Sequence, residues 1–208
     1  MAINYTILAQ VIDISKDVPQ KTDVFLVDTH VWYWMTYTRA SLRTTPPAQH
    51  QITYYPAYMK AALNAGSEIF QSHLSLAELA HQIEKAEQEI YEKTAGGIKP
   101  KEYRHNLSSE RSRVVSEIRT AWSQVTSLAK PLVVAIDTPM ANSALARLQI
   151  EKVDGYDLFI LESMKNHKVM QIITDDGDFC SVKGIQVFTA NLNVIQAARR
   201  QGKLVIRK

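Results

Sequence analysis

The sequence predicts an α/β fold in which a mostly parallel central sheet is flanked by helices, a three-layer arrangement of the Rossmann-like type. Short apolar runs without alternation, such as residues 24–27, have the pattern of strands buried on both faces. Segments with apolar residues at helical spacing separate these runs, and strands alternating with helices are typical of a parallel sheet. We expect a single domain over residues 1–208, because this length suits one domain with an elaboration.

Before residue 75 we expect strands and helices in alternation. A helix over residues 29–37 follows the second strand directly, and residues 39–55 are expected to form a long polar loop. Pro56 is then expected to begin a helix that Gly66 ends, because proline favours the first helical turn and glycine the position after the last. The strands are expected at residues 5–14, 24–27 and 68–74.

Two long helices are expected over residues 75–94 and 108–129. At the start of the first, Ser75 and Glu78 fit the Ser-x-x-Glu capping box. Apolar residues recur at helical spacing in both segments, as expected for helices that each bury one face. Together they make an enlarged helical insertion over about residues 75–129, between two strands of the sheet.

The last third of the chain returns to alternating strands and helices. Asp137 is expected to cap a helix that Pro139 opens. Further helices are expected at residues 156–167 and 193–201. The strands are expected at residues 131–136, 170–174, 185–189 and 204–206.

The composition argues against several classes of protein. No stretch approaches the 18 or so consecutive apolar residues of a membrane span, and we expect no secretory signal. The single cysteine, Cys180, allows no internal disulfide and fits a reducing, cytoplasmic compartment. The net charge of +3 is too small to indicate nucleic-acid binding by itself. Neither a glycine-rich phosphate loop, nor a zinc-spaced histidine pair, nor a serine-nucleophile elbow is present.

Acidic residues stand where several of the expected elements begin or end. Asp28 and Asp176 each follow an apolar strand, whereas Glu78 and Asp157 lie in the first turns of helices. In open parallel sheets, ligands bind in the crevice outside the carboxyl ends of the strands. We therefore expect these four side chains to reach one acidic pocket. Clustered carboxylates repel one another, and a hard divalent cation with oxygen ligands would relieve that repulsion.

Structural interpretations compete with this one. Glu78 and Asp157 can simply favour the dipole at a helix N-terminus. An N-cap is favoured over a ligand for Asp154. Asp175 and Asp178 have the pattern of ordinary loop acids, although physical reasoning alone leaves both as alternatives to Asp176.

The order of these acids resembles that of the PIN domain family, which is typified by toxins of bacterial toxin–antitoxin pairs and by RNA-processing nucleases. The resemblance covers about residues 22–191 and leaves residues 1–22 as an N-terminal extension. It rests on four segments in order: residues 27–30, residues 75–79, Asp157 at the start of an apolar helix, and residues 174–179.

The resemblance implies a site and a chemistry. It implies a hydrolase dependent on Mg²⁺ or Mn²⁺ that cleaves phosphodiester bonds in RNA, usually single-stranded, with carboxylates holding the metal that activates water. Thr174 matches a polar residue that supports the site, Asp178 matches a secondary acid, and Asp154 is counted with these supporting residues. The catalytic and metal-binding acids would be Asp28, Glu78, Asp157 and Asp176.

Two other functions are alternatives to a metal-dependent nuclease. A catalytically inactive PIN-like module that binds RNA or a protein partner is the main alternative, because of the enlarged insertion. A phosphatase that uses a covalent aspartate is disfavoured, because His30 stands where such enzymes carry a second aspartate. The partners to expect are an RNA substrate, an antitoxin or other protein, and a second copy of the chain, but no membrane.

Two further groups of residues have a structural and a functional interpretation. Four aromatic residues follow the first acid closely and cannot all face one side of a helix. Packing is therefore favoured over base stacking for this group. Its members are Trp32, Tyr33, Trp34 and Tyr37. A solvated surface is favoured over phosphate binding for the basic residues of the insertion. They are Lys99, Lys101, Arg104, His105, Arg111, Arg113 and Arg119.

Overall fold

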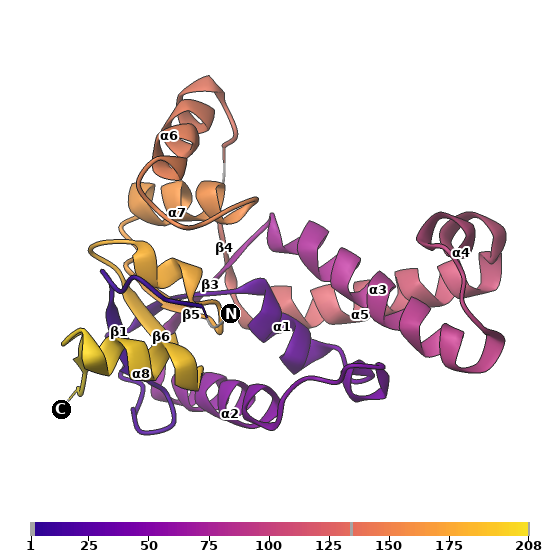
Figure 1. Cartoon of the computed structure of the whole chain (residues 1–208), viewed down its shortest axis with the longest axis horizontal. Helices are drawn as coiled ribbons and strands as arrows, with labels where there is room; N and C mark the ends of the chain where they lie inside the picture. The colour runs from indigo at the N-terminus through magenta and orange to yellow at the C-terminus, as the bar shows by residue number, and fades with distance from the viewer. Residues whose placement is uncertain (1–2, 134, 208) are drawn as a thin grey trace.

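The structure is built around a parallel sheet. It is a computed structural model that describes residues 3–133 and 135–207 (Figure 1). The seven strands found in these residues have the order β4-β3-β2-β5-β6-β1-β7, and all neighbours are parallel. The predicted fold class is therefore confirmed. The strands are β1 (Gln10–Asp13), β2 (Val24–Val27), β3 (Glu68–Ser72), β4 (Lys130–Leu132), β5 (Gln171–Ile173), β6 (Gln186–Thr189) and β7 (Leu204–Val205).

The strand order reverses between β2 and β5. From β2 the chain proceeds outward through β3 to β4, and it then returns to place β5 on the other side of β2. Ligands of open parallel sheets bind outside the carboxyl ends of the strands at such a reversal. Asp28 follows β2 and Thr174 follows β5, so both stand at this point.

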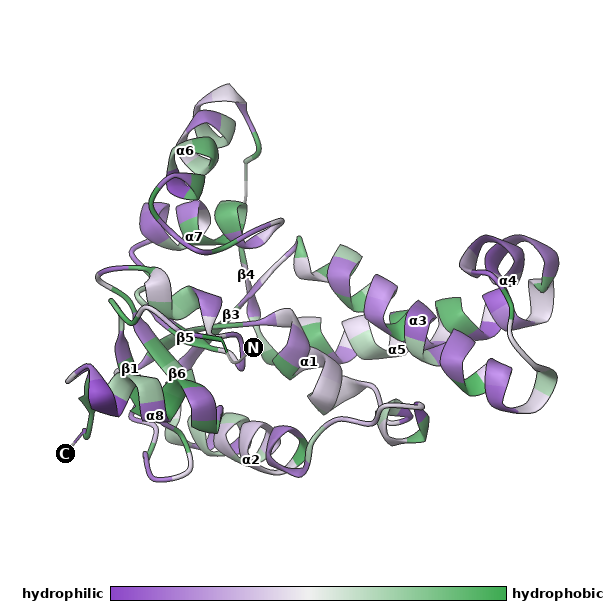
Figure 2. Ribbon diagram, viewed as in Figure 1, coloured by the Kyte–Doolittle hydropathy of each residue, from purple (hydrophilic) through white to green (hydrophobic). Residues whose placement is uncertain are grey.

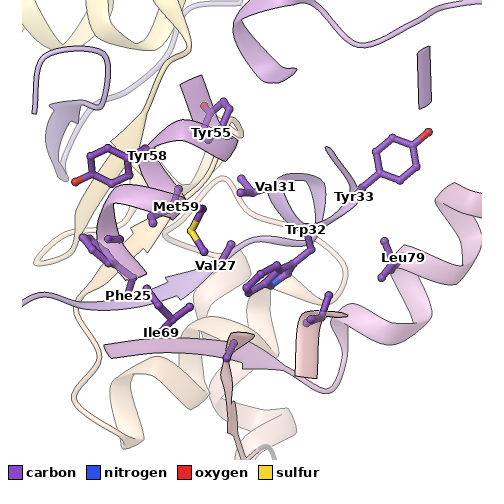
Figure 3. Packing of buried hydrophobic residues seen from close by; sticks show 14 of the residues in the cluster. Phe25, Val27, Val31, Trp32, Tyr33, Tyr55, Tyr58, Met59, Ile69 and Leu79 are labelled. Atoms are coloured by element: carbon purple, nitrogen blue, oxygen red, sulfur yellow. The ribbon is translucent and has the colours of Figure 1, made fainter. Parts of the chain in front are cut away.

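Helices cover both faces of the sheet, and alternation along each strand divides the core between the two faces. In β2, Phe25 and Val27 pack with the first, second, third and fifth helices, whereas Leu26 packs with the seventh and eighth. Figure 3 shows Phe25 and Val27 beside Trp32 and Met59 of two of these helices. The helices are α1 (Thr29–Thr36), α2 (Gln49–Ala65), α3 (Ser75–Ala95), α4 (Pro100–Asn106), α5 (Ser108–Leu128), α6 (Thr138–Leu148), α7 (Asp157–Asn166) and α8 (Leu192–Arg200).

Two helical projections extend from the sheet (Figure 1). One contains α3, α4 and α5, and the other contains α6 and α7. The first occupies the predicted insertion, and its two long helices are confirmed. Its outer end at α4 is mostly hydrophilic (Figure 2). Within the described part of the chain, no helix is both long and apolar enough to cross a membrane.

A buried carboxylate joins the first projection to α1. Glu87 of α3 is fully buried, and its two oxygens accept hydrogen bonds from the Tyr37 hydroxyl at 2.7 Å and from Arg113 Nε of α5 at 3.0 Å. The Arg39 guanidinium lies 3.4 Å from the same carboxylate. Burial and the hydrogen bond to Glu87 raise the pKa of Tyr37, so this hydroxyl stays a donor. The three partners satisfy a charge that burial would otherwise disfavour.

The prediction of a loop over residues 39–55 was wrong. A short 3₁₀ helix, η1 (Ala40–Leu42), lies within that range, and α2 begins at Gln49, so Pro56 is inside the helix instead of at its start. The turn before the proline is held by tertiary contacts. The Tyr55 ring is fully buried, and its hydroxyl donates to an Asp175 oxygen at 2.7 Å. These contacts stabilise the helix where proline removes a backbone donor.

The expected capping box at Ser75 was also wrong. The N-cap of α3 is Leu74, Ser75 is the first helical residue, and no side chain caps this end. The Glu78 side chain instead accepts a hydrogen bond from the hydroxyl of Thr29, which belongs to α1. The predicted cap of α6 is confirmed, since an Asp137 oxygen accepts from the Met140 amide at 2.9 Å.

Several expected elements have different bounds. The strand predicted over residues 5–14 is confined to β1, and the one over residues 131–136 to β4. Val133 is largely exposed after β4, and Val134 lies outside the described residues. The short helix α4 was not among the expected elements, and Pro100 opens it at its first position. Proline suits that position because a backbone amide there would have no intrahelical acceptor, so no helical hydrogen bond is lost.

Replacing Glu87 by alanine should destabilise the fold strongly. The change leaves the Arg113 and Tyr37 groups without their acceptor, and breaking a buried ion pair costs about 3–5 kcal/mol. Glu68→Ala is the control, because Glu68 pairs with Lys130 on the surface, where such pairs contribute about 0–1 kcal/mol. Urea unfolding measures both free energies. Equal losses in the two variants would contradict the role of Glu87.

Candidate active site

Asp28 is held at the carboxyl end of β2. Its amide donates to the Ile173 carbonyl at 3.1 Å, which continues the β2–β5 pairing by one residue. Its extended backbone makes it the N-cap residue of α1, but its side chain caps nothing. Instead, its Oδ2 accepts a hydrogen bond of 2.6 Å from the Thr174 hydroxyl. The carboxylate is only 8% exposed and is thereby oriented toward the end of the neighbouring strand.

Thr174 connects two of the predicted acids. Its hydroxyl donates to Asp28 and accepts from the Asp176 amide at 2.9 Å. Asp176 Oδ1 in turn accepts from the Asp178 amide at 2.8 Å, at the start of the 3₁₀ helix η2 (Asp178–Ser181). A single buried hydroxyl therefore fixes the acids that follow β2 and β5 relative to each other.

Glu78 and Asp157 approach from the two helical projections. Glu78 lies in the first turn of α3 and Asp157 in the first turn of α7. The Asp154 carbonyl accepts from the Asp157 amide at 3.1 Å. The expectation that the Asp154 side chain caps this helix was wrong, because the N-cap is Tyr156 and no side chain caps this end.

These acids surround one hollow of about 460 Å³. Asp28, Glu78, Asp157 and Asp176 all line it, and they come from four different elements or the turns beside them. Asp154 lines it as well. The remaining lining residues are His30, Ala77, His81, Gln82 and Tyr156. The hollow lies where the strand order reverses, as the sheet topology leads one to expect.

Burial and neighbouring carboxylates disfavour ionisation of Asp157, Glu78 and Asp176. Burial, and then the carboxylates of Asp28, Glu78, Asp176 and Asp154, raise the pKa of Asp157 to about 9. Burial also raises the pKa of Glu78, although the hydrogen bond from Thr29 acts the other way. It raises that of Asp176, where the Asp178 amide opposes the shift. The side chains are therefore near enough to influence each other's charge.

The three adjacent acids after β5 have different surroundings. Asp175 faces α2, where it accepts from Tyr55 and from Gln51 Nε2 at 2.8 Å and lies 3.4 Å from His50 Nε2. Asp178 does not line the hollow, and burial followed by the charge of Asp154 raises its pKa. Of the three, only Asp176 lines the hollow, so geometry distinguishes what the sequence left open.

The donor set suits a hard divalent cation. In the part of the chain that the structure describes, no three His, Cys, Asp or Glu side chains converge into a ready-made metal site. The carboxylates around the hollow are nevertheless oxygen donors of the kind that Mg²⁺ and Mn²⁺ prefer. Burial and the neighbouring carboxylates raise the pKa of Asp157, so added positive charge would favour its ionised form. The residues therefore fit a cation that binds between them.

The comparison with protein families decides the family. The sequence pattern that describes the PIN domain matches residues 25–185. The chain belongs to the PIN domain family. Its members are generally nucleases that depend on divalent metal ions.

The other comparisons add little to the family match. The chain resembles the crystal structure of PAE2754 from Pyrobaculum aerophilum with a TM-score of 0.39 and 13% sequence identity, over 85% of this chain and 96% of that one. A search of curated proteins found no match.

Some residues around the site of this PIN domain were not anticipated. His81 and Gln82 follow the predicted Glu78 by three and four residues, which places them on the same face of α3, and this spacing could have identified them. Thr29, which donates to Glu78, had no recognisable signal. Tyr5 had none either: its ring covers Gly177 so closely that a Cβ there would clash with it.

Replacing the ionisable carboxyl of Asp157 should make the metal-free protein increasingly more stable than the natural one as the pH rises. The unfolded carboxyl ionises near its usual pKa of 3.8, whereas the folded one holds its proton to about pH 9, so unfolding releases a proton between these values. Stability is therefore lost as the pH rises, by up to about 1.4 kcal/mol per pH unit. Asp157→Asn removes this dependence, and its advantage over the natural protein should widen from pH 6 to pH 8.

Urea unfolding in the presence of a chelator measures that advantage. Asp137→Asn serves as the control, because Asp137 caps α6 away from the hollow and asparagine caps equally well. An Asp157→Asn variant that has the same pH dependence as the natural protein would show that the repulsion is absent.

Thr174→Val should destabilise the protein by about 1–3 kcal/mol. Valine has the same shape but leaves the part-buried Asp176 amide without its acceptor and the buried Asp28 carboxylate without this donor. Thr174→Ser keeps the hydroxyl and should lose much less. The comparison is made by urea unfolding, and a serine variant as unstable as the valine variant would argue against the hydrogen bonds.

Proposed function

We propose that this PIN domain is an endoribonuclease that depends on Mg²⁺ or Mn²⁺ and hydrolyses phosphodiester bonds in single-stranded RNA. One observation carries the proposal: the carboxylates of Asp28, Glu78, Asp157 and Asp176 line the same hollow at the reversal of the sheet. Acids gathered against their own repulsion are typical of sites that hold catalytic cations. The family membership supports the same chemistry.

The four carboxylates would hold the cation or cations. A bound cation lowers the pKa of water and stabilises negative charge on the reacting phosphate. Thr174 orients one oxygen of Asp28, and Thr29 occupies one oxygen of Glu78, so each acid is directed by a hydroxyl. Asp157 is the acid whose ionisation is most disfavoured, and it depends most on added positive charge. The carboxylates would bind and orient, and none of them would attack the phosphorus.

His30 lies at the rim of the hollow. Its side chain is 55% exposed, and its Nδ1 is 4.0 Å from Asp28 Oδ2. From this position it can donate a hydrogen bond to a phosphate oxygen that enters the hollow. We therefore propose that His30 contacts the substrate, whereas Thr174, Asp178 and Asp154 support the acids.

Replacing Asp28 by asparagine should reduce RNA cleavage by at least about 100-fold, because the change removes charge from the centre of the site while keeping its shape. The assay uses end-labelled single-stranded RNAs of mixed sequence with Mg²⁺ or Mn²⁺, and a chelator should abolish cleavage. Asp137→Asn is the matched control, since it makes the same chemical change at a helix start outside the hollow.

Full cleavage by Asp28→Asn would rule out the proposed site and mechanism. A different result would favour the alternative function, a non-catalytic PIN module. In that case the natural protein shows no metal-dependent turnover, and its binding to RNA or to a protein survives replacement of the acids.

A further inference from the structure

A second hollow adjoins the acidic one. It has a volume of about 500 Å³, and three residues, His30, His81 and Gln82, line both hollows. The two are thus neighbouring parts of one depression between α1 and α3. A strand whose phosphate enters the acidic hollow would therefore pass directly into the second one.

An aromatic side chain forms one wall of the second hollow. Three members of the aromatic group in and after α1 are buried in the core, as the packing interpretation predicted. Trp34 is only partly buried, and it lines the second hollow. The rings of Tyr55 and His30 lie beside it, with centroids 5.2 Å and 6.0 Å away. Trp34 is therefore held in place while part of its surface faces the hollow.

A second part of the lining comes from residues 43–47, a segment that α3 holds in place. Arg43 donates two hydrogen bonds to Glu89, at 2.9 Å and 2.8 Å. Lys93 Nζ donates to the carbonyls of Leu42 and Arg43, at 2.6 Å and 3.0 Å. Pro46 and Pro47 then line the hollow. A segment anchored in this way is preformed, so ordering it on ligand binding costs little free energy.

The charges around this hollow differ from those around the first. Lys85 and His81 lie exposed on the α3 side, and Arg43 is paired with Glu89. Among the described residues, no carboxylate lines the second hollow, whereas several line the first. An aromatic surface with a nearby lysine suits an unpaired base attached to a phosphate backbone.

We propose that the second hollow binds one unpaired nucleobase of the RNA, next to the phosphodiester that is cleaved, by stacking on Trp34. Gln82, which lines both hollows, is placed to hydrogen-bond to the edge of the base or to its ribose. Lys85 neutralises the adjoining phosphate. This inference rests on the proposed function, and it adds a contact that helps to select single-stranded substrates.

The test compares two variants that both keep an apolar side chain at this position. Trp34→Phe retains an aromatic ring, whereas Trp34→Leu does not. Both are made in the Asp28→Asn background, so that binding of a fluorescein-labelled single-stranded RNA of mixed sequence can be followed by anisotropy without turnover. Loss of one stacked base should weaken binding by about tenfold or more for leucine, and much less for phenylalanine.

Trp122 of α5 supplies the matched control. It packs against the core from a partly buried position and lines neither hollow. Trp122→Phe and Trp122→Leu should leave RNA binding unchanged. Thermal unfolding of all four variants separates a lost contact from a disturbed fold, because the Trp122 variants show what a comparable loss of packing does to binding.

A substrate series locates the base. In the natural protein and in Trp34→Leu, cleavage is measured on RNAs that carry a single abasic nucleotide at successive positions around the cleaved bond. At one position the abasic RNA should be cleaved equally by both proteins, because the stacking partner is missing in each case. At the other positions Trp34→Leu should have the higher KM.

The outcomes separate this inference from the proposed function. Equal RNA binding by the leucine, phenylalanine and unchanged proteins would overturn the base site even if cleavage requires Asp28. Weaker binding by Trp34→Leu in a protein that cleaves no RNA would support the base site and overturn the nuclease. An absence of RNA binding in every variant would overturn the base site as well.

Discussion

Repulsion between carboxylates is the constraint around which this structure is organised. Four of them line one hollow, and burial together with the neighbouring carboxylates raises the pKa of Asp157 to about 9. Each acid comes from a different element or from the turn beside it. Threonine hydroxyls donate hydrogen bonds to two of the acids and orient them. The parallel sheet is what makes this arrangement feasible, because the ends of β2 and β5 are adjacent at its reversal.

The sequence predicted those features that depend on local pattern. The buried strand before Asp28 and the two long helices of the insertion were recognisable from apolar spacing, and the order of the acids indicated the family. Only the family resemblance favoured Asp176 over Asp175, because the physical distinction depends on Tyr55, a residue 120 positions away that binds Asp175. The same long-range contacts override the helix-breaking tendency of Pro56. Local sequence does not reveal these contacts, so the predicted start of α2 was too late in the chain.

The two helical projections have a common relation to the site. Each contributes an acid at its base, Glu78 at the start of α3 and Asp157 at the start of α7. The first projection is tied to α1 by the buried Glu87, which binds groups on both sides. Because the acids lie where the projections join the sheet, a change in the angle of either one would alter the spacing of the carboxylates.

The position of β1 bears on how the protein is made. The first strand in the chain pairs with β6 and β7, and Gln10 lies opposite Gln186. During synthesis β1 therefore has no partner until residues 186–189 have left the ribosome. Contacts of such long sequence separation form slowly. Tyr5, which precedes β1, covers the loop of Asp176, so that loop gains its cover only after β1 has paired with β6. In the nascent chain, the acidic hollow therefore stays incomplete until these contacts have formed.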